Sequence, residues 1–84
     1  MPAKQFLGSE IALLRKTLKL SEGEFATQIG LEDRRMLKML ESGKMRPSVA
    51  VKRALFKLLN RHAGRSTKIK NLKQAIDERA QRGW

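Results

Sequence analysis

Apolar residues recur at helical spacing along almost the whole chain, and no segment alternates apolar and polar residues for long enough to predict a β-strand. The pattern divides into five runs, separated by short polar or glycine-containing breaks. The apolar positions of the first, fourth and fifth runs are Ile11, Leu13, Leu14 and Leu18; Val51, Leu55, Leu58 and Leu59; and Ile69, Leu72 and Ile76. The sequence therefore predicts an all-α fold, a compact domain of five helices.

The second helix has the most explicit start in the sequence. Ser21 and Glu24 have the spacing of a capping box, in which each side chain accepts a hydrogen bond from the other residue's backbone N–H. Leu20 and Phe25 occupy the two hydrophobic-staple positions around this start. Gly30 can adopt the left-handed conformation that ends a helix. These signals predict a short helix over about 22–29.

The other helices have weaker boundary signals. We expect Ser9 to cap the first helix and Asp33 to cap the third, which ends near Gly43. The fourth helix follows Pro47-Ser48 and ends near Gly64, and the fifth spans about 67–82. The linker-like stretch 63–66 divides the chain into a domain over 1–64 and a C-terminal helix over 65–84.

Two short helices joined by a glycine-containing turn are typical of a helix-turn-helix, whose second helix enters the major groove of DNA. Such a crossing needs a small residue in the first helix, and Ala26 stands four residues before Gly30. It also needs an apolar anchor after the turn, a place that Leu31 takes. The segment over about 22–41 is therefore the candidate DNA-binding unit.

Charge supports a nucleic-acid partner. Nineteen Lys and Arg against eight acids give a net charge of +11, spread over the whole length, and such a positive field most often serves phosphate binding. The absence of cysteine and the single His62 argue against disulfides and against a thiolate or multi-histidine metal site. No run approaches a membrane span and the N-terminus lacks the apolar h-region of a signal peptide, so we expect a cytoplasmic, nucleoid-associated protein without a membrane partner.

Two runs carry a family resemblance: LSEGEFATQIGL over 20–31 and ESGKMRPS over 41–48. They resemble the Cro/CI-type (XRE) helix-turn-helix family, and the resemblance covers about residues 9–60. The same segment is similar to small phage and plasmid regulators, including anti-CRISPR-associated autorepressors and HigA-like antitoxins. The resemblance implies a lambda-repressor-like DNA-binding domain.

The resemblance also implies roles for individual residues. Arg15 matches the family arginine that pairs with the glutamate of the Glu-Ser-Gly turn, here Glu41, and such a pair would lock the first helix to the end of the third. The positions that match phosphate-contacting residues of the family are Ser21, Gln28, Lys44 and Arg46.

The third helix departs from the family pattern. The stretch 30–41 is one residue longer than in the commonest members, and Leu40 replaces the usual aromatic residue. Either Met36 and Met39 or Leu37 and Leu40 can then face the core. We favour the leucines, because that register also turns Glu41 toward Arg15.

In either register three basic side chains, those of Arg34, Arg35 and Lys38, lie on or beside the outward face of the third helix. They are the candidates for base contacts, because arginine and lysine donate to guanine O6 and N7 in the major groove, although each can instead contact only phosphate. The acids Glu32 and Asp33 either cap the helix or accept from cytosine N4.

The C-terminal helix carries a narrow apolar stripe, Ile69, Leu72 and Ile76, which must find a protein surface. That surface belongs to its own domain, to a second copy or to another partner, and the lysines at 68, 70 and 73 could instead follow a DNA backbone. We expect self-packing or dimerisation. If the stripe dimerises, a chain without residues 67–84 should still fold.

The sequence thus predicts a regulator, a repressor or autorepressor that acts as a homodimer on an inverted repeat in double-stranded DNA. One alternative is an antitoxin that also binds a toxin protein. Another is an RNA-binding or nucleoid protein of low specificity. No paired acids, metal-ligand spacing or phosphate-cradling glycine loop indicates an enzyme, so we expect no catalytic residue, no metal and no cofactor.

Overall fold

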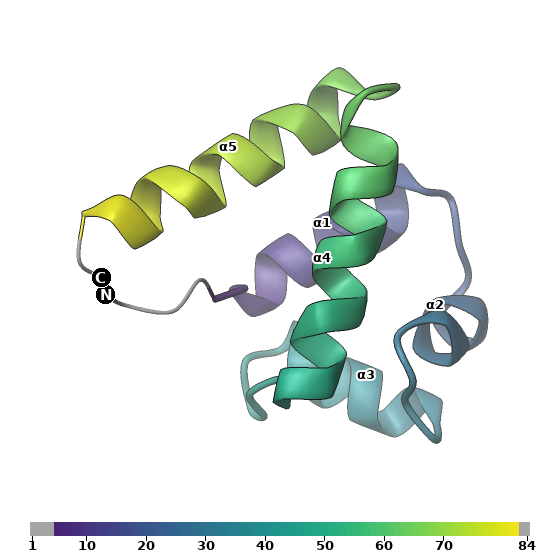
Figure 1. Cartoon of the computed structure of the whole chain (residues 1–84). Helices are drawn as coiled ribbons and strands as arrows, with labels where there is room; N and C mark the ends of the chain where they lie inside the picture. The colour runs from purple at the N-terminus through teal and green to yellow at the C-terminus, as the bar shows by residue number, and fades with distance from the viewer. Residues whose placement is uncertain (1–4, 83–84) are drawn as a thin grey trace.

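The computed structural model describes residues 5–82, which contain five helices and no strand (Figure 1). The helices are α1 (Gly8–Thr17), α2 (Glu22–Gln28), α3 (Arg34–Glu41), α4 (Val49–Ala63) and α5 (Thr67–Gln81). In Figure 1 α4 runs through the middle of the molecule, α1 lies behind it, α2 and α3 form the lower end, and α5 crosses the C-terminal end of α4. The predicted all-α fold of five helices is confirmed.

Four helices begin at a side chain that accepts a hydrogen bond from the backbone three residues later. Ser21 Oγ accepts from Glu24 N at 3.1 Å, and the Glu24 carboxylate accepts from Ser21 N at 3.2 Å, which completes the predicted capping box. Asp33 caps α3 as expected, and Ser48, after which the fourth helix was expected to follow, caps α4. Ser66, expected only as part of a linker, caps α5. Each cap supplies a partner for an N–H that the helix leaves unpaired.

The start of α1 differs from the prediction. The helix begins at Gly8 rather than after Ser9, and the residue before it, Leu7, has no capping oxygen of its own. The Glu10 carboxylate accepts from Leu7 N at 2.8 Å instead. A charged acceptor makes the stronger hydrogen bond, so the carboxylate rather than the Ser9 hydroxyl determines where α1 starts.

One continuous core joins all five helices. It is formed by Phe6, Ile11, Leu14, Phe25, Ala26, Ile29, Leu31, Leu37, Leu40, Val51, Leu55, Leu58, Leu59, Ile69, Leu72 and Ile76. Leu37 and Leu40 are completely buried whereas Met39 is 40% exposed, so the favoured register of α3 is confirmed. Leu13, expected to broaden the buried face of α1, is 46% exposed, because the helical repeat turns it away from the side that carries Ile11 and Leu14.

The apolar stripe of α5 belongs to this core. Ile69, Leu72 and Ile76 are 1%, 6% and 1% exposed, and α5 packs against α4 and α1. These three side chains therefore pack within their own chain, the self-packing alternative of the prediction, and leave little surface for a second copy. A chain that ends before α5 would expose the apolar surfaces of α1 and α4 to water, so we expect it to lose stability rather than only the ability to pair.

An unpredicted ion pair ties the end of α5 to the beginning of α1. Arg79 donates to both carboxylate oxygens of Glu10, at 2.8 and 2.6 Å, and to the carbonyl of Gln5 at 2.8 Å. The hydrogen bonds to Glu10 raise the pKa of Arg79 despite its partial burial. The last turn of α5 is thus tied to the start of α1 through the Arg79 side chain.

The role of α5 in the core can be measured with two substitutions on the same helix. Ile76→Ala should lower the free energy of unfolding by about 2–5 kcal/mol, because it removes a buried side chain and leaves a cavity. Gln74→Ala, at an exposed position, should change it by less than about 0.5 kcal/mol. Urea denaturation compares the two, and equal small effects would mean that α5 is not part of the core.

Candidate nucleic-acid interface

A tight turn over 29–33 determines how α3 leaves α2. Leu31 N donates to the carbonyl of Ala26 at 2.8 Å, and Gly30 adopts a φ of +80°, a left-handed conformation that favours glycine. Ala26 and Leu31 are both buried, 3% and 9% exposed. The small side chain lets the helices approach each other, and the leucine anchors the chain after the turn.

The outward face of α3 presents basic side chains on a well-anchored helix. Leu37 and Leu40 attach one side of α3 to the core, while Arg35 and Lys38 are exposed. At about 100° per residue these two basic residues point away from the buried leucines. All three residues predicted to contact bases are exposed, and two of them, Arg35 and Lys38, share the outward face of α3.

Arg34 occupies a different position. A Cβ atom added at Gly23, in the first turn of α2, would lie 3.8 Å from the Cδ atom of Arg34. The aliphatic part of Arg34 therefore lies beside the start of α2, at the edge of the outward face. Asp33 lies 3.8 Å from the guanidinium of Arg35, but both side chains are largely exposed, so water weakens the attraction.

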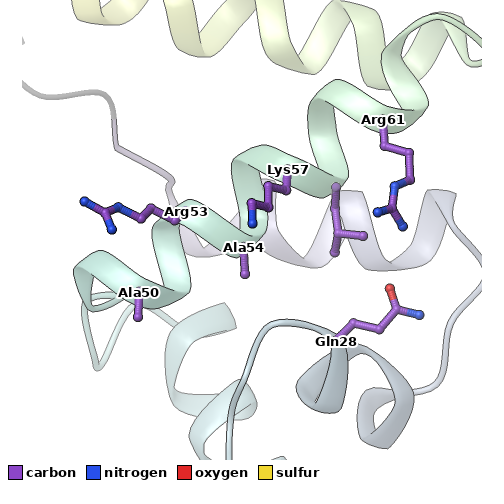
Figure 2. A pocket seen from close by; sticks show the side chains of 7 residues that line it. Gln28, Ala50, Arg53, Ala54, Lys57 and Arg61 are labelled. Atoms are coloured by element: carbon purple, nitrogen blue, oxygen red, sulfur yellow. The ribbon is translucent and has the colours of Figure 1, made fainter.

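The predicted phosphate-contacting residues do not gather in one place. Lys44 and Arg46 are exposed in the loop 42–48 directly after α3, and a hydrogen bond of 2.9 Å from Lys44 N to the carbonyl of Met39 fixes that loop. Ser21 caps the start of α2. Gln28, at the other end of α2, instead faces α4 (Figure 2).

Figure 2 shows the hollow to which Gln28 belongs, a space of about 440 Å³ between α2 and α4. Three basic side chains of α4 border it and α3 contributes none of its lining, which comprises Gln28, Ala50, Arg53, Ala54, Lys57, Leu58 and Arg61. This cluster of cations on α4 was not among the residues predicted from the sequence to contact DNA. The sequence does contain a pattern that indicates such a cluster, because residues 42–76 include ten Lys and Arg but no Asp or Glu.

The outward face of α3 also includes an apolar residue that the sequence reasoning did not consider as a contact. Met39 is 40% exposed and follows Lys38 on the helix. Ser42, which ends α3, is exposed and donates to the carbonyl of Met39 at 3.1 Å. An exposed apolar side chain between polar ones can contact a thymine methyl group in the major groove.

The last turn of α3 is fastened to α1. Arg15 Nε donates to Glu41 Oε2 at 2.8 Å and Arg15 Nη2 to Oε1 at 3.3 Å, the pair that the family resemblance implies. The two side chains are 16% and 14% exposed. Gly8 lies so close to the same turn that an added Cβ would be 2.5 Å from the carbonyl oxygen of Glu41. Only a glycine allows this approach.

Hydrogen bonding to Glu41 raises the pKa of Arg15 above its ordinary value, although burial opposes the shift. A cation whose pKa is higher in the folded state stabilises that state fully at pH values below the pKa of the unfolded chain. This stabilisation is lost only as the pH rises through the raised pKa. Arg15 therefore stays charged throughout the neutral range, where it holds α3 in place.

No family model, curated protein or solved structure matches this chain. Within residues 5–82 no helix is long and apolar enough to cross a membrane. The same residues contain no group of three or more His, Cys, Asp or Glu side chains that could hold a metal ion. The candidate site is thus defined by its own geometry and charge.

The Arg15–Glu41 pair can be tested with a double-mutant cycle of Arg15→Met, Glu41→Gln and both together. Because both partners are mostly buried, the coupling free energy of unfolding should be at least about 1 kcal/mol. A matched cycle on the exposed pair, Asp33→Asn with Arg35→Met, keeps an N-cap residue and should give less than about 0.5 kcal/mol. Equal coupling in the two cycles would contradict a special role for Arg15.

Proposed function

We propose that this chain is a sequence-specific regulator that binds double-stranded DNA, a repressor of the Cro/CI type in which α2, the turn 29–33 and α3 act as a helix-turn-helix. The observation that carries the proposal is the position of Arg35 and Lys38, exposed on α3 directly opposite the buried Leu37 and Leu40. A helix held rigidly on one side and basic on the other suits insertion into the major groove.

The surroundings of α3 favour the same partner. Lys44 and Arg46 follow it in an exposed loop, where they can contact phosphates on one side of the groove. Ser21 and Arg34 lie at the beginning of α2 and α3, where they can contact phosphates on the other side. With a net charge of +11, the chain should approach DNA under long-range attraction.

The proposed division of labour predicts different effects for two kinds of substitution. After a preferred duplex has been selected from a random library, Arg35→Ala or Lys38→Ala should cost about 1–3 kcal/mol on that duplex and relax preference at one base pair. Lys44→Ala should weaken preferred and scrambled duplexes by similar factors and reduce the slope of log affinity against log salt by about one. Fluorescence anisotropy measures both quantities.

Lys68→Ala serves as the charge-matched control, because Lys68 is an exposed residue on α5, away from α3. It should leave the ratio of preferred to scrambled affinity unchanged. The proposal fails if the double variant Arg35→Ala/Lys38→Ala keeps that ratio as well.

We also propose that two copies act together on an inverted repeat. An eight-residue α3 is about 12 Å long and reaches only a few base pairs, too few to select one site in a genome. Two copies related by a two-fold axis double the number of base pairs read. Because the α5 stripe is buried in each chain, the copies meet through another surface.

The dimer proposal sets the geometry of the preferred site. Its half-sites should be inverted and their centres about 10 base pairs apart, or a multiple of that spacing. Sedimentation of the chain with a full and a half site should give complexes of two chains and one chain, with much tighter binding to the full site. Equal affinity per chain for the two sites would rule out cooperation between copies.

A further inference from the structure

The hollow between α2 and α4 carries a regular row of cations. Arg53, Lys57 and Arg61 follow one another at intervals of four residues, so neighbouring side chains start about 6 Å apart and the row extends for about 12 Å. All three are exposed. In Figure 2 all three start from α4, the Arg61 side chain points toward Gln28 on α2, and the Arg53 side chain extends away from Gln28.

The lining of the hollow offers hydrogen-bond donors to an anion and no opposing charge. Its polar groups are the three cations and one amide, and it contains no carboxylate. The acid-free stretch 42–76 includes the whole of α4, so no acid on that helix neutralises the row. These groups select a ligand that is negatively charged along its length.

The floor of the hollow favours a sugar-phosphate strand over an acidic protein as the ligand. It consists of Ala50, Ala54 and the buried Leu58, with no aromatic residue and no deep apolar pocket. Protein interfaces usually depend on large apolar or aromatic anchors, and the lining contributes none that is both large and exposed. A sugar-phosphate strand needs only spaced cations, donors and room to approach, all of which are present.

We propose that this hollow is a second nucleic-acid contact, one that binds a phosphodiester backbone without regard to sequence. Arg53, Lys57 and Arg61 neutralise successive phosphates, and the Gln28 amide donates to one of their oxygens. The site shares no lining residue with α3, so it does not rest on the proposed base recognition. The strand belongs either to a duplex or to a single-stranded segment, which offer the same chemistry.

The test compares two triple variants of equal charge. Arg53→Gln/Lys57→Gln/Arg61→Gln removes the row, and Lys16→Gln/Arg65→Gln/Lys68→Gln removes three exposed cations elsewhere. Both are titrated with a scrambled 20-base-pair duplex, a 20-nucleotide oligo-dT strand and polyglutamate over a range of salt concentrations. The row variant should reduce the slope of log affinity against log salt by about 2–3 on the duplex or by about 2 on the single strand.

If the row variant lowers the slope on the duplex, the hollow binds duplex DNA, and if it lowers the slope on oligo-dT, the hollow binds a single strand. A larger fall in slope than the control triple variant shows, on either nucleic acid, supports the site. If both triple variants lower the slope equally, net charge alone accounts for the effect and the proposed site is ruled out. A loss confined to polyglutamate would assign the hollow to an acidic protein and overturn it equally. Because the duplex is scrambled, the experiment tests the hollow even if the chain recognises no particular base sequence.

A second pair of variants avoids any loss of folding from three simultaneous changes. Ala50→Glu places a negative charge in the hollow, and Asn71→Glu places one on the exposed side of α5. Ala50→Glu should weaken binding of the scrambled duplex or of the single strand at least several-fold more than Asn71→Glu. Equal weakening on both probes would contradict the site.

Discussion

The position of α3 depends on how its last turn is held against α1. An isolated helix of eight residues is not stable in water, so tertiary contacts must provide both its stability and its direction. Gly8 lets the start of α1 approach the carbonyl of Glu41, and Arg15 takes hold of the Glu41 carboxylate. The turn at Gly30 restricts the other end. With both ends fixed, the outward direction of Arg35 and Lys38 follows from the helical repeat.

Signals that act over a few residues made much of this arrangement predictable. The capping box at Ser21 and Glu24 and the cap at Asp33 each depend on a single turn of backbone, so the sequence contains the whole interaction. The register of α3 could also be chosen, because only one register both buries Leu37 and Leu40 and turns Glu41 toward α1. For the same reason the exposed face of α3 could be predicted before its surroundings were known.

The parts that could not be predicted depend on residues far apart in the chain. Arg79 and Glu10 are 69 positions apart, and no local pattern indicates that they meet. Their contact places the carboxylate that starts α1, which explains why Ser9 was wrongly expected to be the cap. The surface against which the α5 stripe packs could not be predicted for a similar reason. An apolar face indicates that it will be buried, but not which surface will bury it. Gln28 likewise lies beside α4 rather than α3, because its neighbours depend on how α2 is placed against α4 in the folded chain.

The distribution of charge links the fold to the proposed partner. Of the eight acids, Glu10 and Glu41 pair with mostly buried arginines, and Glu24 and Asp33 cap helices. At least half of the acidic residues therefore serve the structure, while basic residues such as Arg35, Lys38 and Lys57 remain on the surface. Their mutual repulsion disfavours the compact state, and a bound polyanion relieves it. Salt thus has opposite effects on the two properties: it screens the repulsion within the free chain, and it weakens the attraction to a phosphate backbone. A chain with this distribution of charge is therefore stabilised most by binding a polyanion whose charges complement its basic surface.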